Sequence, residues 1–321
     1  MTSGWAPSPQ STALSTARRS GARHIAEVVG TKGCLVVGLL ALAVPGVPPA
    51  SSAAAARLSA QETLRVVAFA DSTVAALDGV ERAYDERLAE LLRDRGVEAT
   101  SFNAAGPGET LEAARRRFDV DVLHRDPDVV LIQFGINDAA VDGRARRTDP
   151  FVSQSRFAEL LEYYVRIARS QGVEPVLLTP NPLLWTPQLR RKWRFPPYDL
   201  DDRWGLNVVL RDYAEVVRQV AARQDVELVD VFQTFVEYES SEGTGPSPTS
   251  TDELLADGMH PSDRGHALIA QLLADPVLRA AERARISRTI AAQGARNRAI
   301  LVGHRFRGIL HQPYGGGATL R

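Results

Sequence analysis

Five short apolar runs, separated by amphipathic helical segments, restrict the folds open to this chain. The central runs are continuous in Val, Leu, Ile, Ala and Phe, which is typical of strands buried on both faces of a parallel sheet. The expected strands are 64–70, 97–103, 128–134, 173–179 and 226–231, and the expected helices are 81–95, 110–123, 157–171, 203–224 and 261–273. The sequence therefore predicts one three-layer α/β domain with a five-stranded parallel sheet.

Charge and cysteine content exclude several classes of protein. The chain has 321 residues and a formal net charge of −1, whereas a nucleic-acid partner requires a basic surplus. The single cysteine, Cys34, allows no intramolecular disulfide, and the six histidines form no zinc-binding pattern with it. We therefore expect neither a nucleic-acid partner nor a metal centre.

Residues 1–56 have the layout of a secretory signal. A polar, basic segment precedes an apolar run from Cys34 to Val47, and small residues follow as far as Ala56. The run is shorter than the ~20 residues of a membrane span, so an uncleaved anchor is the less favoured alternative. A lipid-modified cysteine would end such a run, whereas Cys34 begins it. We expect a secreted, periplasmic or envelope protein that works near a membrane or the cell envelope.

The α/β domain is expected to span 57–281 and to be followed by an Arg-rich extension, 282–321. Two insertions interrupt the regular alternation of strands and helices. The segment 240–251 is a loop of low complexity, and the segment 181–205 is rich in aromatic and basic residues. Because the aromatic insertion follows the fourth strand, it is either a hydrophobic brace over the sheet or a wall that faces a substrate.

Polar residues follow the predicted strands at the sheet edge where open α/β proteins bind their ligands. Ser72 follows the first strand, and Asp257 and His260 follow the fifth across a loop. A serine hydroxyl becomes a nucleophile when a histidine accepts its proton, and a carboxylate orients that histidine. We expect these three residues to act together on a carbonyl group.

A carbonyl under attack develops an oxyanion, which requires converging hydrogen-bond donors. The candidate donors are the backbone N–H of Ser72, a backbone N–H near Ala105 after the second strand, and the side-chain amide of Asn137 after the third. Asp138 is expected to be structural, since the predicted triad already contains an acid.

Four short motifs resemble, in order and spacing, those of the SGNH, or GDSL, hydrolase family. They read Ala70-Asp71-Ser72, Asn103–Thr110, Gly135–Asp138 and Asp257–His260. The resemblance covers the whole predicted domain, and each motif follows the strand that it follows in the family. It implies a flavodoxin-like sheet, esterase, thioesterase or lipase activity, and no cofactor.

Two alanines depart from the family pattern. Ala70 replaces the first glycine of the serine motif, and the match of Asn103–Thr110 places Ala105 where the family has its oxyanion glycine. The backbone N–H survives a change from glycine to alanine, but a positive φ there would cost an alanine ~1 kcal/mol or more. A shift of one residue would give the role to Gly106.

The combined features predict a secreted serine esterase that acts on esters of carbohydrates or lipids, with a preference for carbohydrate acetyl esters. One alternative is a non-catalytic module of the same fold that binds carbohydrate or the cell envelope. Another is a sugar O-acyltransferase, in which a sugar hydroxyl takes the place of water. The same Ser-His-Asp chemistry serves hydrolysis and acyl transfer.

A prediction follows from the N-terminal segment. The exported protein should begin near residues 54–57 and lack Cys34, because the small residues there suit signal cleavage. Mass spectrometry of the secreted material measures the new N-terminus directly. A protein that keeps Cys34 and remains in the membrane fraction would contradict cleavage.

Overall fold

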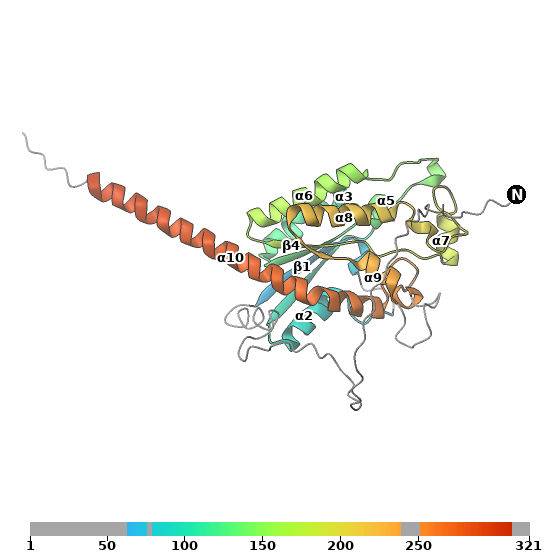
Figure 1. Cartoon of the computed structure of the whole chain (residues 1–321), viewed down its shortest axis with the longest axis horizontal. Coiled ribbons are helices and arrows are strands. Elements are labelled where there is room, and N and C mark those ends of the chain that lie inside the picture. The colour runs from blue at the N-terminus through green and yellow to red at the C-terminus, as the bar shows by residue number, and fades with distance from the viewer. Residues whose placement is uncertain (1–62, 76–78, 239–250, 310–321) are drawn as a thin grey trace, which may run out of the picture. The chain divides into compact units, whose positions relative to one another are not determined.

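The computed structural model describes residues 63–75, 79–238 and 251–309. The predicted secretory segment 1–56 and nearly all of the loop 240–251 lie outside these residues. One five-stranded sheet forms the centre, with all strands parallel and in the order β2-β1-β3-β4-β5 (Figure 1). The strands are β1 (Leu64–Ala70), β2 (Ala99–Ala105), β3 (Val129–Gln133), β4 (Glu174–Leu178) and β5 (Glu227–Val229).

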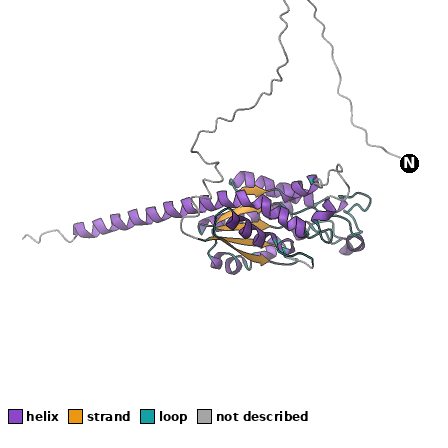
Figure 2. Ribbon diagram, turned by 90° about the horizontal axis from the view of Figure 1, so that it is seen from below, coloured by secondary structure: helices purple, strands orange, loops and turns teal. Residues whose placement is uncertain are grey.

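Helices cover both faces of the sheet, so the predicted three-layer α/β fold is confirmed (Figure 2). One face is covered by α2 (Tyr84–Asp94), α9 (Val231–Glu237) and the first part of α10 (Asp263–Ile309), and the other by α3 (Leu111–Ala114), α4 (Phe118–Asp121), α6 (Gln154–Ser170) and α8 (Leu210–Gln224). Two further helices, α5 (Ile136–Ala139) and α7 (Pro187–Lys192), lie in the loops after β3 and β4.

Strand β1 shows why the apolar runs read as continuous. Val67 and Phe69 pack into one helical layer, while Val66, Ala68 and Ala70 pack into the other. Because both faces are buried, both sets of alternate positions are mainly apolar. The five residues of β3 and the five of β4 are likewise all buried.

Several elements differ from the sequence-based expectations, and three of these differences concern helices that cover the sheet. The predicted helix 110–123 is two short helices, α3 and α4, with an interruption at Arg115–Arg117. Helix α9 was not predicted; Asp230 caps it, because its side chain accepts a hydrogen bond from the N–H of Gln233. Helix α10 runs through the predicted boundary between 281 and 282 without a break.

The second part of α10 is still attached to the domain beyond that boundary. Ala284 is buried, and Arg288 forms an ion pair of 2.6 Å with Asp128. Ile286 and Ile290 are exposed, and the helix extends away from the sheet in Figure 1. The domain therefore uses a few residues that the sequence assigned to the Arg-rich extension.

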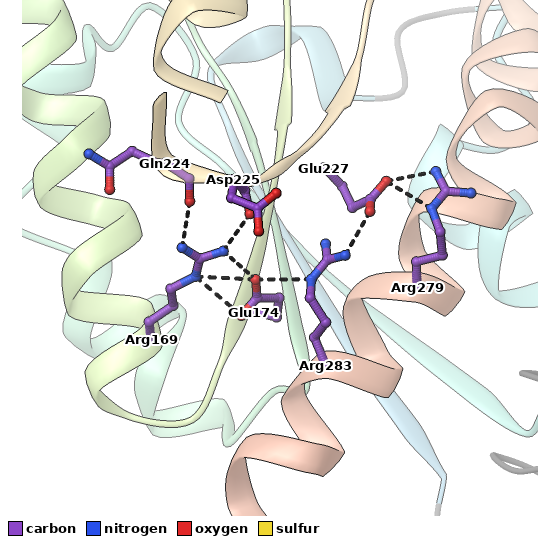
Figure 3. A network of polar contacts seen from close by, with 7 residues as sticks. All are labelled: Arg169, Glu174, Gln224, Asp225, Glu227, Arg279 and Arg283. Atoms are coloured by element: carbon purple, nitrogen blue, oxygen red, sulfur yellow. Dashed lines mark hydrogen bonds and ion pairs between the residues drawn. The ribbon is translucent and has the colours of Figure 1, made fainter. Parts of the chain in front are cut away.

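A polar network joins α10 to the starts of β4 and β5 (Figure 3). Because all strands are parallel, these starts lie at the opposite end of the sheet from the strand ends that Ser72 and Asn137 follow. Glu174 is buried and accepts hydrogen bonds from Arg169 at 2.6 Å and Arg283 at 3.3 Å. Arg283 also contacts Glu227 at 2.8 Å, and Arg279 contacts the same carboxylate at 2.6 Å. The buried carboxylate thus links α6, β4 and α10.

We expect Glu174→Gln to lower the free energy of unfolding by ~1.5–3 kcal/mol, because it removes the charge that two guanidinium groups share in a buried position. Arg279→Gln is the matched control: Arg279 is 53% exposed, so its loss should cost ~1 kcal/mol or less. Urea denaturation of the full chain measures both. Equal losses for the two variants would contradict the assignment of Glu174 as the anchor.

Candidate active site

The structure brings together Ser72, His260 and Asp257, which are far apart in sequence. Ser72 Oγ lies 2.9 Å from His260 Nε2, and His260 Nδ1 lies 2.8 Å from Asp257 Oδ2. The imidazole is therefore bonded to the hydroxyl on one side and to the carboxylate on the other. This geometry suits transfer of the serine proton to Nε2 while the carboxylate fixes the ring.

Asp257 keeps its charge although half of its side chain is buried. Partial burial alone would raise the pKa of Asp257. Hydrogen bonds from the His260 imidazole and from the backbone N–H groups of His260 and Met259 outweigh that effect and hold the pKa well below its usual range. A permanently ionised carboxylate stabilises an imidazolium next to it.

A tight turn holds this carboxylate against the histidine. Gly258 has φ +85°, and a Cβ there would collide with the carbonyl oxygen of Leu184. A 2.8 Å hydrogen bond from the Leu184 N–H to the Gly258 carbonyl also joins these two segments of the chain. Asn181, which follows β4, donates to the Met259 carbonyl at 2.8 Å. The loop after β4 thus supports the turn that carries His260.

Ser72 begins a 3-10 turn, Ser72–Val74, directly after β1. Asp71 caps this turn, because its carboxylate accepts the Thr73 N–H at 2.9 Å. Asp71 is fully buried, and burial raises its pKa to about 6 despite the hydrogen bonds from Thr73. The hydrogen bond by which Asp71 caps the turn therefore also fixes the position of Ser72, which begins that turn.

The turn after β2 differs from the sequence-based expectation. The N–H of Ala105 donates to the side chain of Asn103 at 3.1 Å, and the N–H of Gly106 donates to the Ala70 carbonyl at 2.9 Å. Both N–H groups have acceptors within the chain, so this turn gives no support to the oxyanion role expected for Ala105. Gly108 has φ +75°, and its N–H donates to no other described residue.

Asn137 lies at the start of α5, beside this turn. Its Nδ2 donates to the Glu109 carbonyl at 3.0 Å and lies 3.3 Å from Asp71 Oδ2. The turn before it requires a glycine at position 135, where φ is +133° and the Pro180 ring is 3.1 Å from where a Cβ would be. The amide is thus fixed between the segments that follow β1 and β2.

Asp138 has a structural contact rather than one with the triad. Its Oδ1 accepts the N–H of Leu111 at 2.8 Å, which ties α3 to α5, and its Oδ2 is buried with no described partner. Burial raises the pKa of Asp138 to about 7, the Leu111 N–H opposes the rise, and the negative charge of Asp71 adds to it.

Arg117 organises the same edge of the sheet, and the sequence analysis did not single it out. Its guanidinium binds the Ala104 carbonyl at 2.7 Å, the Ala70 carbonyl at 3.0 Å and the Glu109 carboxylate at 2.6 Å. The ion pair passes over Gly106, where a Cβ would collide with both side chains. Gly106 is therefore needed for close approach, not for a positive φ.

A cavity of about 700 Å³ lies beside the segments that follow β2 and β3, and Gly108 and Asn137 form part of its wall. The aromatic insertion contributes Trp193, Phe195 and Tyr198 to the same wall. Trp185, in contrast, donates its indole N–H to the carbonyls of Asp199 and Asp202 and so braces the insertion internally. The insertion therefore both braces itself and lines the cavity.

Among the described residues, no group of three or more His, Cys, Asp and Glu side chains is arranged to hold a metal ion. Within the same part of the chain, no helix is both long and apolar enough to cross a membrane.

A family model for the GDSL-like Lipase/Acylhydrolase family matches residues 68–268. The chain belongs to this family. The match runs from β1 into α10 and includes Ser72, Asn137, Asp257 and His260, so the resemblance that the four motifs indicated is confirmed at the level of the family. Membership of this family supports an ester hydrolase.

Two relatives come from Bacillus subtilis (strain 168). The uncharacterized lipoprotein YqeF is 29% identical over 217 residues, which are 65% of this chain and 88% of that protein. The probable rhamnogalacturonan acetylesterase YesY is 25% identical over 166 residues, which are 51% of this chain and 68% of that protein.

Two solved structures share the fold. The lipase/acylhydrolase from Enterococcus faecalis superposes with a TM-score of 0.50 at 24% identity, covering 67% of this chain and 96% of that one. The acetyl xylan esterase AlAXEase superposes with a TM-score of 0.51 at 21% identity, covering 65% and 98%.

The buried Asp138 predicts a pH dependence of stability. Its pKa is raised from 3.8 to about 7 in the folded protein. Its contribution to stability is therefore full below pH ~4 and is lost as the pH rises through ~7. When the pH is raised from 5 to 8, the unmodified chain loses this contribution and Asp138→Asn does not. The difference in unfolding free energy between the two should therefore shift by at least ~1 kcal/mol in favour of Asp138→Asn.

Urea denaturation at the two pH values measures this difference. Asp94→Asn, at an exposed position at the end of α2, is the matched control and should follow the unmodified chain. Parallel pH curves for Asp138→Asn and the unmodified chain would show that Asp138 is not protonated on folding.

Proposed function

We propose that this protein is a serine esterase that removes acetyl groups from a carbohydrate outside the cytoplasm. The observation that carries the proposal is the continuous hydrogen-bonded chain from Ser72 Oγ through His260 to Asp257, with contacts of 2.9 and 2.8 Å. Membership of a family of ester hydrolases supports it.

In the proposed reaction, Ser72 Oγ attacks the ester carbonyl while His260 Nε2 takes the hydroxyl proton. Asp257 keeps the ring oriented and stabilises the imidazolium. The tetrahedral intermediate collapses, and His260 returns the proton to the leaving sugar oxygen. Water, deprotonated by His260, then attacks the acetyl-enzyme and releases acetate and the free serine.

Three donors serve the oxyanion in this proposal: the Asn137 side-chain amide and the backbone N–H groups of Ser72 and Gly108. Gly108 takes the place first expected for Ala105, because the Ala105 N–H already donates to Asn103. The N–H groups of Ser72 and Gly108 donate to no other described residue, and Gly108 and Asn137 line one cavity. Preorganised donors of this kind stabilise the charge that develops in the transition state.

The carbohydrate preference rests on the wall beside the oxyanion donors. Trp193, Phe195 and Tyr198 present aromatic surface there, and flat aromatic rings suit sugar rings. The printed description of YesY as a probable rhamnogalacturonan acetylesterase agrees with this class of substrate. Transfer of the acetyl group to a second sugar is distinguished from hydrolysis by its product.

The location outside the cytoplasm rests on the secretory layout of residues 1–56. The description of YqeF as a lipoprotein is in keeping with an envelope location for a relative. The catalytic part of the proposal does not depend on this location.

The proposal predicts that Ser72→Ala lowers the rate of ester hydrolysis by ~10⁴–10⁶-fold while the fold is kept, because the nucleophile is lost. Asp257→Asn should cost ~10⁴-fold, since the amide favours the wrong histidine tautomer. p-Nitrophenyl esters from acetate to palmitate and acetylated polysaccharides, tested side by side, report both activity and acyl length.

Ser155→Ala, at an exposed serine of α6, is the matched control and should have unchanged rates. If Ser72→Ala keeps more than about a tenth of the activity, the assignment of the nucleophile is wrong. Faster turnover of long acyl chains than of acetate would favour a lipid substrate instead.

A further inference from the structure

The cavity beside the oxyanion donors has two kinds of wall. Gly108 and Asn137 bound one side, and Asn137 Nδ2 lies 3.3 Å from Oδ2 of Asp71, the residue before Ser72; residues of the insertion and of the loop after α5 bound most of the rest. Its volume of about 700 Å³ is within the range of pockets that hold a small organic ligand. A group that occupies it is therefore part of the same molecule as the ester, or lies next to it.

The aromatic part of the wall is held in place by specific contacts. The Tyr198 hydroxyl accepts a hydrogen bond from the Val141 N–H at 2.9 Å. The rings of Tyr198 and Trp193 pack edge to face, with their centroids 5.3 Å apart. Phe195 packs so close to Gly143 that a Cβ at that position would collide with it. The loop after α5 and the insertion thus form one preformed surface, which favours a rigid ring as the ligand.

The charged part of the wall has two cations without a carboxylate partner. Arg144 and Lys192 line the cavity, and neither forms an ion pair with a described residue. Lys192 Nζ lies 5.0 Å from the centre of the Trp193 ring, which is its one described contact. An ammonium group over an aromatic face is available to an anion that approaches along that face.

The two carboxylates of the same wall do not cancel these cations. Glu112 is bound by Arg156 at 2.6 Å and by Arg115 at 3.2 Å. Asp142 accepts hydrogen bonds from the backbone N–H groups of Arg144 and Ala145, which cap its own turn. Asp142 keeps its negative charge, but Glu112 is paired with two arginines, so the two cations outnumber the one remaining carboxylate and the cavity combines aromatic faces with a small surplus of positive charge.

We propose that this cavity binds an acidic sugar residue, a uronate, next to the acetylated sugar of the substrate. The sugar ring stacks on the aromatic wall, and its carboxylate pairs with Lys192 and Arg144. This inference rests on the proposed function and specifies its substrate as an acetylated polysaccharide that contains uronic acids. An acyl chain would leave the two cations without a partner.

The test is a binding measurement, because binding can succeed or fail independently of catalysis. Short oligogalacturonates and their methyl-esterified forms, which differ in the carboxylate charge, are titrated calorimetrically into the full-length protein. The free acids should bind at least ~5-fold more tightly, the size that one or two exposed ion pairs supply. That advantage should shrink at 0.5 M salt, since salt screens exposed charges.

Variants identify the residues responsible. Lys192→Gln combined with Arg144→Gln should bring the affinity ratio of acid to methyl ester close to one. Arg191→Gln is the matched control, because Arg191 is an exposed cation adjacent to Lys192 that does not line the cavity. It should keep the full ratio. Release of acetate from acetylated forms of both ligands should follow the same order, as a difference in KM rather than in kcat.

Several outcomes would overturn the inference. The first is that the free acids bind no more tightly than their methyl esters. The second is that the affinity ratio of acid to ester survives the double variant, or that Arg191→Gln lowers it as much. The third is that a phosphorylated glycan binds more tightly than the uronate. Hydrolysis of p-nitrophenyl acetate by the unmodified chain separates the two proposals. If that activity is absent while the acids bind selectively, the proposed function fails and the binding site stands; the reverse result removes the uronate site alone.

Discussion

Parallel pairing of the strands is the constraint on which the site depends, because it forces every strand to end at the same edge of the sheet. Ala70 of β1 lies opposite Ala105 of β2 and Gln133 of β3. The chain segments that follow these three residues therefore start side by side, and they carry Ser72, Gly108 and Asn137. A slip of one residue between strands would turn both faces of a strand toward the wrong layer. Burial of the core therefore also fixes how these three segments are aligned along the strand direction.

Register alone brings the segments together, and Arg117 holds them. Its guanidinium binds the carbonyl groups of Ala70 and Ala104 at the ends of β1 and β2 and the carboxylate of Glu109. It also lies 4.6 Å from the centre of the Phe69 ring. The backbone carbonyl of Glu109 in turn accepts the Asn137 amide. These contacts thus extend from the core to the Asn137 amide, and a side chain at position 106 would displace the Arg117–Glu109 ion pair.

Patterns that arise from burial could be predicted from the sequence, whereas features set by long-range contacts could not. The apolar runs of β3 and β4 marked strands because both of their faces are covered. The predicted helix 110–123 is interrupted where Arg117 reaches two strand ends, and these partners are 13 and 47 positions away in sequence. The motifs placed Ser72, Asn137, Asp257 and His260 correctly at one edge. Spacing could not reveal that the Asn103 side chain binds the Ala105 N–H. The glycines at positions 106 and 108 were a signal that the proposed oxyanion donor is one of the residues after Ala105.

The departures from the family pattern also have a physical account. Ala70 is fully buried and packs with Val66 and Ala68 in the layer beneath α2 and α10, so its methyl group lies in the core. The three aspartates near this end of the sheet differ in how their surroundings shift their pKa values. Burial raises the pKa of Asp71 and of Asp138, whereas three hydrogen bonds lower that of the half-exposed Asp257. Of these three carboxylates, the one that contacts His260 therefore stays ionised over the pH range in which the other two take up protons, so the imidazolium of the proposed mechanism would have a negative charge beside it.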